Sequence, residues 1–359
     1  MDEFVHSFPA ARGSQAGRPC YVAMCPLRLV PKIFVFNEDE VPPELRAQRK
    51  LNRSRIPEIS QYLIENHGNY TLSAITASVN ARVFFEPSAD TGLGQNLGIL
   101  SIPMDAQILI NDGQHRRAAI EHAISENPEL GYDNIPVLFF IDEGLVRSQQ
   151  MFADLNKHAV RPSDSISTLY DHRDNVAELA RAMVKLVPVF SRLTEMEKSS
   201  ISNRSTKLFT LSAIKNATRS LLSKAKGEVV QEDEKKLAAD FWASVSAHMP
   251  DWQRALEKKV ASADLREQYV HAHGVILQAL GQIGADLLPR PESHWKKVLR
   301  KLEAIDWSRS NPDWEGRAMH HGRISKARTS VILTANYIKM ALGLELSASE
   351  KAYERDLAK

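Results

Sequence analysis

The chain has 359 residues, of which 43% are hydrophobic and 25% charged, an ordinary composition for a folded protein with room for two domains. The formal net charge is only +2, so a surface that binds nucleic acid must be a local patch. No apolar run reaches the roughly 18 residues that span a bilayer, and the first residues lack the apolar stretch of a signal peptide. We therefore expect a cytoplasmic protein that has no membrane contact.

The N-terminal half alternates short apolar runs with turn residues. Residues 1–18 contain Gly13, Ser14 and Gly17, which predicts a flexible tail. An amphipathic helix is expected from Ile56, and the segment Gly92–Gly94 is interpreted as a hairpin tip because no helix follows it. The β-branched and aromatic runs predict strands at residues 21–24, 32–36, 72–79, 82–85, 97–102, 108–111 and 135–141.

One run in this half carries unusual chemistry. An apolar strand from Ile108 ends at Asn111-Asp112-Gly113, and the helix that follows has Gln114, His115, Arg116 and Arg117 in its first turn. Asp112 or Asn111 is expected to cap that helix. Cations are unfavourable at the positive end of a helix by up to roughly 1 kcal/mol each, which indicates that an anion completes the site. The alternative is an ordinary strand–turn–helix whose charges are solvated.

Residues 112–116 spell the signature of the DGQHR-domain family, and the similarity extends beyond them. Over most of its first 210 or so residues the chain resembles the DndB family, accessory and regulatory proteins of bacterial DNA phosphorothioation. This resemblance implies DNA binding, control of the modification operon, and tuning of the sulfur-transfer complex. The further matching segments are residues 48–59, 76–79, 135–141, 151–157 and 208–212.

The strand–Gly-x-His-Arg–helix unit also resembles the phosphate-binding corner of sulfiredoxin and of the ParB partition proteins. Gln114 stands where sulfiredoxin has its catalytic cysteine, so sulfinic-acid reduction is not expected. The likeness to ParB implies phosphate or nucleotide binding by residues 112–116. The resemblance to the DGQHR-domain family places Asn156 near the corner as an orienting group, with a helix C-cap asparagine as the alternative.

Strand patterns cease near residue 162, and amphipathic helical patterns continue almost to the end of the chain. We therefore predict an α+β protein, in which a mixed-sheet, ParB/sulfiredoxin-like domain at residues 19–165 precedes an all-helical domain at 166–359. No metal site is expected, because Cys20 and Cys25 lack further ligands nearby and the adjacent His320 and His321 would not face each other on a helix.

Two segments of the helical half and one before residue 56 are locally basic, and Gly322 could be a turn that feeds a basic helix of the DNA-binding kind. The alternative is that these charges are solvated. The candidate DNA contacts are Arg49, Arg53, Arg55, Arg204, Lys207, Lys215, Arg219, Arg317, Arg323, Lys326 and Arg328.

The first hypothesis is a binding protein that contacts double-stranded DNA, regulates transcription of the modification operon, and meets the sulfur-transfer complex, either alone or as a homo-oligomer. The alternative is a nucleoside-triphosphatase or DNA-nicking enzyme that uses a nucleoside triphosphate with Mg²⁺ at the corner. Asp112 and His115 would then be the catalytic candidates. A third option is a scaffold whose helical domain docks on partner proteins.

Overall fold

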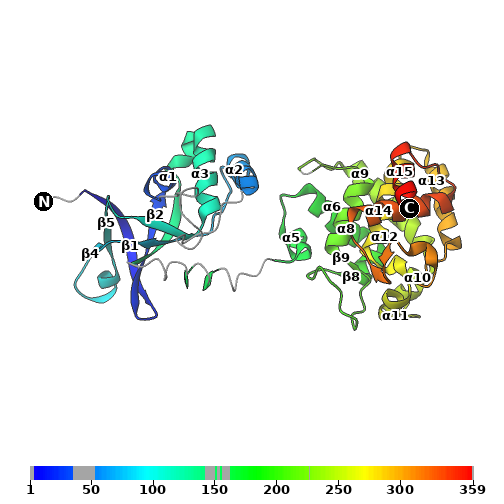
Figure 1. The fold of residues 1–359 in the computed structure, drawn as a ribbon, viewed down its shortest axis with the longest axis horizontal. Helices are drawn as coiled ribbons and strands as arrows, with labels where there is room; N and C mark the ends of the chain where they lie inside the picture. The colour runs from blue at the N-terminus through cyan, green and yellow to red at the C-terminus, as the bar shows by residue number, and fades with distance from the viewer. Residues whose placement is uncertain are drawn as a thin grey trace. The chain divides into compact units, whose positions relative to one another are not determined.

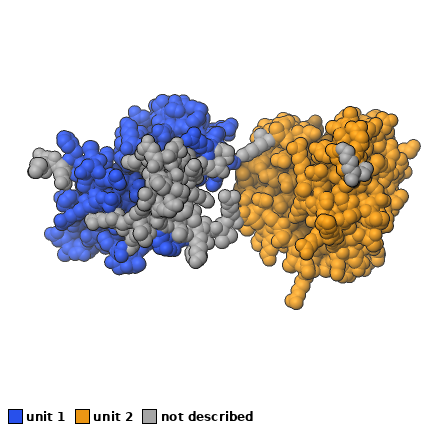
Figure 2. All heavy atoms as spheres, in the orientation of Figure 1, with its two compact units in different colours: residues 1–160 blue, residues 161–359 orange. Residues whose placement is uncertain are grey.

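The computed structural model describes residues 4–34, 53–141, 150–151, 154–155, 162–225 and 227–357. The chain divides into two compact units, Met1–Val160 and Arg161–Lys359 (Figure 2). Among the described residues, no helix is both long and apolar enough to cross a membrane.

Unit 1 is built on a seven-stranded mixed sheet in the order β4-β5-β1-β2-β7-β3-β6. Figure 1 labels its strands β1, β2, β4 and β5. β3 and β7 pair in parallel, and the other neighbouring strands pair antiparallel. The elements of unit 1 are β1 (Val5–Gln15), β2 (Arg18–Pro26), α1 (Val30–Ile33), α2 (Ile56–Glu65), β3 (Ile75–Val79), β4 (Phe84–Pro87), β5 (Leu97–Pro103), β6 (Ile108–Asp112), α3 (Gln114–Glu126) and β7 (Asn134–Ile141).

Helices α1, α2 and α3 of unit 1 pack on one face of the sheet. Leu63 of α2 and Ile120 of α3 share a fully buried cluster with Ala77 and Val137 of the central strands. Alternation along β2 points Val22 and Met24 away from this core, and both side chains are exposed. β6 and β7 flank β3 and run antiparallel to each other, so the strand–helix–strand around α3 is not a parallel crossover.

Two predictions for the N-terminal residues are wrong. Residues 5–15 of the expected flexible tail form β1, which pairs with β2 and also with the distant strand β5. A partner about ninety residues away leaves no signal in the local composition, so the glycines suggested disorder. In the strand expected at 32–36, residues 32 and 33 belong instead to the helical turn α1, where Pro31 occupies a first-turn position that suits its missing N–H. Residues 35 and 36 lie outside the described residues. The β4–β5 hairpin is confirmed.

Unit 2 is mostly helical, but it is not all-helical, because two pairs of two-residue strands, β8–β9 and β10–β11, join its loops. All five tryptophans of the chain lie in this unit, and four of them are fully buried in its core. Its elements are α5 (Asp164–Tyr170), α6 (Asn175–Leu186), α7 (Pro188–Leu193), β8 (Thr194–Glu195), β9 (Phe209–Thr210), α8 (Leu211–Leu221), α9 (Glu232–Ala247), α10 (Pro250–Leu256), α11 (Ser262–Gln268), α12 (Gly274–Leu287), α13 (Glu292–Leu299), β10 (Met319–His320), β11 (Arg323–Ile324), α14 (Arg328–Leu342) and α15 (Ala348–Leu357).

α12 is the central helix of unit 2 and packs closely against α8. Gly281 makes this approach possible, since a Cβ there would lie 2.2 Å from the carbonyl oxygen of Ala217. Thr210 caps α8 by accepting a hydrogen bond from the Ala213 N–H at 3.2 Å. This packing brings the N-terminal ends of α8 and α12 to the cavity described below.

Candidate functional site

The corner predicted from the sequence lies where β6 meets α3. Gly113 has φ +115°, a conformation that favours glycine, and it stands at the N-cap position of α3. In the described part of the chain no side chain caps this helix, so the expectation that Asp112 or Asn111 would do so is wrong. Asn111 is fully buried and accepts a hydrogen bond from the Ser78 hydroxyl at 2.9 Å, whereas Asp112 pairs with Arg116.

The Arg116 side chain makes several hydrogen bonds to neighbouring residues. Its guanidinium donates to the Ser73 hydroxyl at 2.6 Å, to the Ala74 carbonyl at 3.0 Å and to the Asp112 carboxylate at 2.7 Å. Its Nε is buried and has no hydrogen-bond partner among the described residues, and the side chain is 19% exposed. Arg116 therefore ties the segment before β3 to the first turn of α3, and much of its hydrogen-bonding capacity is already used.

The other residues of the corner differ in how far their side chains are exposed to solvent. Gln114 is buried and His115 is half-buried. Arg117 bonds the carbonyls of Pro31 and Phe34 and pairs with Glu121 at 2.9 Å. An anion at this corner would therefore meet chiefly the first backbone N–H groups of α3 and the positive end of its dipole.

This geometry makes Arg116 a stability residue for unit 1. We expect Arg116→Ala to lower the free energy of unfolding by about 2 kcal/mol, because Asp112 and Ser73 lose a charged partner. Circular dichroism should report the loss, while tryptophan fluorescence, which comes only from unit 2, should show an unchanged transition. The exposed Arg18 on β2 serves as the matched control, and an equal loss in Arg18→Ala would contradict this role.

The predicted DNA-contact residues fall into three groups. Three are engaged within unit 2: Lys207 with the Arg192 carbonyl at 2.8 Å, Lys215 with Asp174 at 2.5 Å, and Arg317 with Glu354 at 2.7 Å. Arg49 lies outside the described residues, as does Asn156, the orienting group predicted for the corner. The remaining candidates have exposed side chains: Arg53, Arg55, Arg204, Arg219, Arg323, Lys326 and Arg328.

The helix expected after Gly322 is α14, and its fit to DNA is limited. Most of its length is buried in the core of unit 2, including Val331, Ala335 and Ile338. A helix with such a buried surface does not enter a DNA groove along its length. Its exposed basic residues lie at or just before its first turn.

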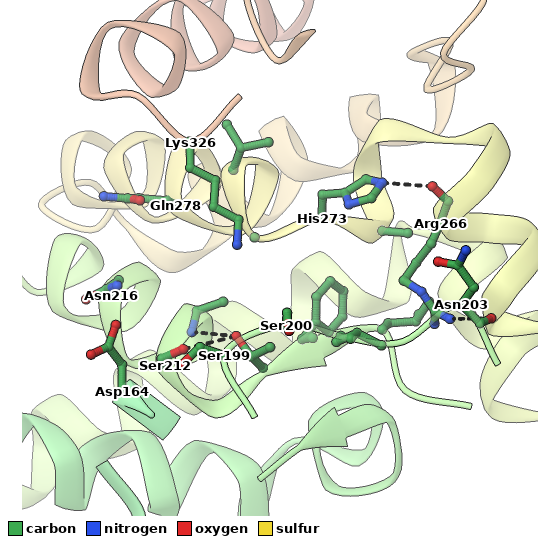
Figure 3. A pocket seen from close by; sticks show the side chains of 18 of the residues that line it. Asp164, Ser199, Ser200, Asn203, Ser212, Asn216, Arg266, His273, Gln278 and Lys326 are labelled. Atoms are coloured by element: carbon green, nitrogen blue, oxygen red, sulfur yellow. Dashed lines mark hydrogen bonds between the residues drawn. The ribbon is translucent and has the colours of Figure 1, made fainter. Parts of the chain in front are cut away.

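A cavity of about 750 Å³ lies in unit 2 at the N-terminal ends of α8 and α12. Asn203 and Asn216 line it from the first basic segment of the helical half, and Lys326 lines it from the second (Figure 3). Arg266 and Arg309 complete its cationic lining. The sequence analysis missed these two arginines, because each is isolated in the chain and no spacing rule relates them.

The cations of this cavity have no ion pair among the described residues. Arg266 donates to the carbonyls of Ser202, Asn203 and Ser205 at 3.0–3.1 Å, and Arg309 donates to those of Glu267 and Gly322 at 3.2 and 2.7 Å. Carbonyls satisfy the donors without neutralising the charge. Lys326 is exposed and extends toward the cavity (Figure 3).

The pKa of His273 is affected by this excess of positive charge. It is the N-cap residue of α12, and its Nε2 donates to the Arg266 carbonyl at 2.9 Å. Burial lowers the pKa of His273 to about 4; the hydrogen bond opposes this shift, and the nearby charges of Arg309, Arg266 and Lys326 add to it. The histidine is therefore neutral at pH 7. The carboxylates on the wall, Asp164 and Glu267, are both exposed.

These features define a two-unit α+β protein with a cationic cavity, whose arginine and lysine side chains are of the chemical kind that binds phosphate groups. The family model of DndB, described as DNA-sulfur modification-associated, matches residues 8–345, and the chain belongs to that family. Membership gives the protein a role in the DNA sulfur modification system. Comparison with curated proteins and with solved structures finds no match.

Proposed function

We propose that this protein is a DNA-binding accessory protein of the DNA sulfur modification system, acting in the cytoplasm and regulating transcription of the modification operon. One observation supports the DNA-binding part: Lys326 of the second basic segment joins Arg266 and Arg309 on the wall of one cavity in unit 2. The first basic segment borders the same cavity with Asn203 and Asn216. The regulatory role and contact with the sulfur-transfer complex rest on the family.

Exposed cations of the second basic segment could bind the backbone phosphates of double-stranded DNA. Arg323 follows Gly322, whose carbonyl accepts from Arg309, and Lys326 lines the cavity itself. Neither Arg323 nor Lys326 has an ion pair among the described residues, so both charges are available to phosphates. Each phosphate neutralised by such a side chain releases counterions, and binding then weakens as salt increases.

The test is fluorescence anisotropy of a labelled DNA duplex across a salt series. Removing both charges in Arg323→Ala/Lys326→Ala should weaken binding about tenfold or more and reduce the salt slope by roughly two. Lys236→Ala/Lys297→Ala removes the same charge from exposed positions on α9 and α13 and is the control. Binding without salt dependence, or equal losses in both double variants, would contradict the proposal.

The corner at residues 112–116 is a second part of the proposal, as a phosphate or nucleotide site related to that of the ParB proteins. Supporting observations are the uncapped start of α3 and the left-handed conformation of Gly113. The enzyme alternative is less favoured, because Asp112 and Arg116 neutralise each other. Phosphate released from ATP with Mg²⁺, and lost in a folded Asp112→Asn variant, would restore that alternative.

A further inference from the structure

We propose that the cavity of unit 2 binds a single nucleotide, with its phosphate at the N-terminal end of α12. The nucleotide is either free in solution or part of a single DNA strand, since both present the same phosphate and base. Nucleotide binding in this cavity does not require duplex DNA to bind Arg323 and Lys326.

The phosphate end of the cavity is set by α12. This 14-residue helix has no side-chain cap, and its first residues, Gly274 and Val275, line the cavity. Arg266, Arg309 and Lys326 also lie on the cavity wall, and all three act on the neutral His273 at the N-cap. Cations gathered at the positive end of a helix repel that end unless an anion lies between them.

A second observation is independent of the helix. Ser199 belongs to the wall of the cavity, and its hydroxyl oxygen is buried without a hydrogen-bond partner among the described residues. Buried hydroxyls in proteins are nearly always satisfied, so an unpaired one beside a cavity indicates a missing partner. Because this oxygen is buried, the Ser199 side chain would have to rotate toward the cavity before an acceptor oxygen of a ligand could bond to it.

The remainder of the cavity suits a nucleobase. Its volume of about 750 Å³ is within the usual range for a small-molecule pocket. Asn216 and Gln278 bring amide groups and Asp164 brings a carboxylate, which together offer donors and acceptors for the edge of a base (Figure 3). An inorganic anion would use the cations but would leave these groups without a role.

Lys326 is the side chain best placed to contact the phosphate without supporting the fold. Arg266 and Arg309 donate hydrogen bonds to loop carbonyls, whereas Lys326 is exposed and has no hydrogen bond or ion pair among the described residues to lose. Asn216 is also exposed, on the cavity side of α8. Lys326→Gln removes the charge, and Asn216→Asp adds a negative charge within the cavity at nearly constant size. Neither change should unfold unit 2.

The experiment is calorimetric titration of the full chain with a deoxynucleoside 5′-monophosphate, its unphosphorylated nucleoside, inorganic phosphate and a short single-stranded oligonucleotide. We expect the monophosphate, the oligonucleotide or both to bind more tightly than nucleoside or phosphate alone. Lys326→Gln and Asn216→Asp should each weaken that binding about tenfold, as loss of a charge-assisted contact does, while Lys297→Gln should not. Binding by only one of the two nucleotide probes identifies the source.

Two results would overturn the inference: no binding of either nucleotide probe, or cavity variants that behave like Lys297→Gln. The duplex measurement keeps this inference separate from the proposed function. Nucleotide binding that persists when duplex binding is absent removes the DNA-binding proposal and leaves the cavity site intact. Duplex binding that persists in Asn216→Asp while nucleotide binding is lost supports two distinct uses of unit 2.

Discussion

Glu354→Ala is expected to lower the free energy of unfolding of unit 2 by about 3 kcal/mol, because it leaves a buried guanidinium without its partner. Arg317 donates from Nη1 and Nη2 to the two carboxylate oxygens of Glu354, each at 2.7 Å, and the side chains are only 14% and 19% exposed. Asn336, which is fully buried, adds a third bond to Glu354 at 3.0 Å. This contact fastens α15, which has no buried residue of its own.

The ionised state of Glu354 supports this reading of the contact. Burial alone would raise the pKa of Glu354, but hydrogen bonds from Arg317 and Asn336 and the charge of Arg317 hold it below its usual value. Its stabilising contribution is therefore present at neutral pH and is lost as the pH falls through the lowered pKa.

Urea unfolding followed by tryptophan fluorescence measures this prediction in unit 2 alone. The control is Glu232→Ala, which breaks an ion pair to Lys235 from a side chain that is 87% exposed and should cost less than about 1 kcal/mol. Equal shifts in the two variants would mean that the Arg317–Glu354 pair is no stronger than a surface pair.

Arg317 also shows why part of the candidate site could not be predicted. In the sequence it belongs to a basic segment, and nothing local distinguishes it from Arg323 or Lys326. Its partner Glu354 lies 37 residues later, and only the packing of α15 brings the two together. Charge along the chain therefore identified basic segments but could not show which cations are neutralised.

At the corner, too, the sequence predicts the local elements but not the contacts between distant residues. The strand, the glycine turn and the helix at residues 108–126 follow from local pattern, and β6 and α3 lie there. The partners of Arg116 do not follow, because Ser73 and Ala74 reach it through the pairing of β3 with β6. Likewise, the cavity in unit 2 collects residues from α8, α11 and α12 and from loops, and no spacing in the sequence relates them.

Acidification is expected to destabilise unit 2 through His273 before carboxylates become protonated. The folded pKa of about 4 lies below the ordinary value of 6.5, so neutral His273 stabilises the fold above pH 6.5. This contribution decreases as the pH falls toward 4. Integrating the shift gives a loss of about 2 kcal/mol between about pH 7.5 and 5.

The measurement that isolates His273 is urea unfolding by tryptophan fluorescence at these two pH values, for the native chain and for His273→Gln. Glutamine retains a donor for the Arg266 carbonyl but does not titrate, so the variant should lose about 2 kcal/mol less on acidification. The remaining ionisable side chains, including His271, are common to both proteins, and their contributions should largely cancel. Identical acid losses would mean that His273 is protonated in the folded state as readily as in the unfolded chain, so that neither its burial nor the nearby cations lower its pKa.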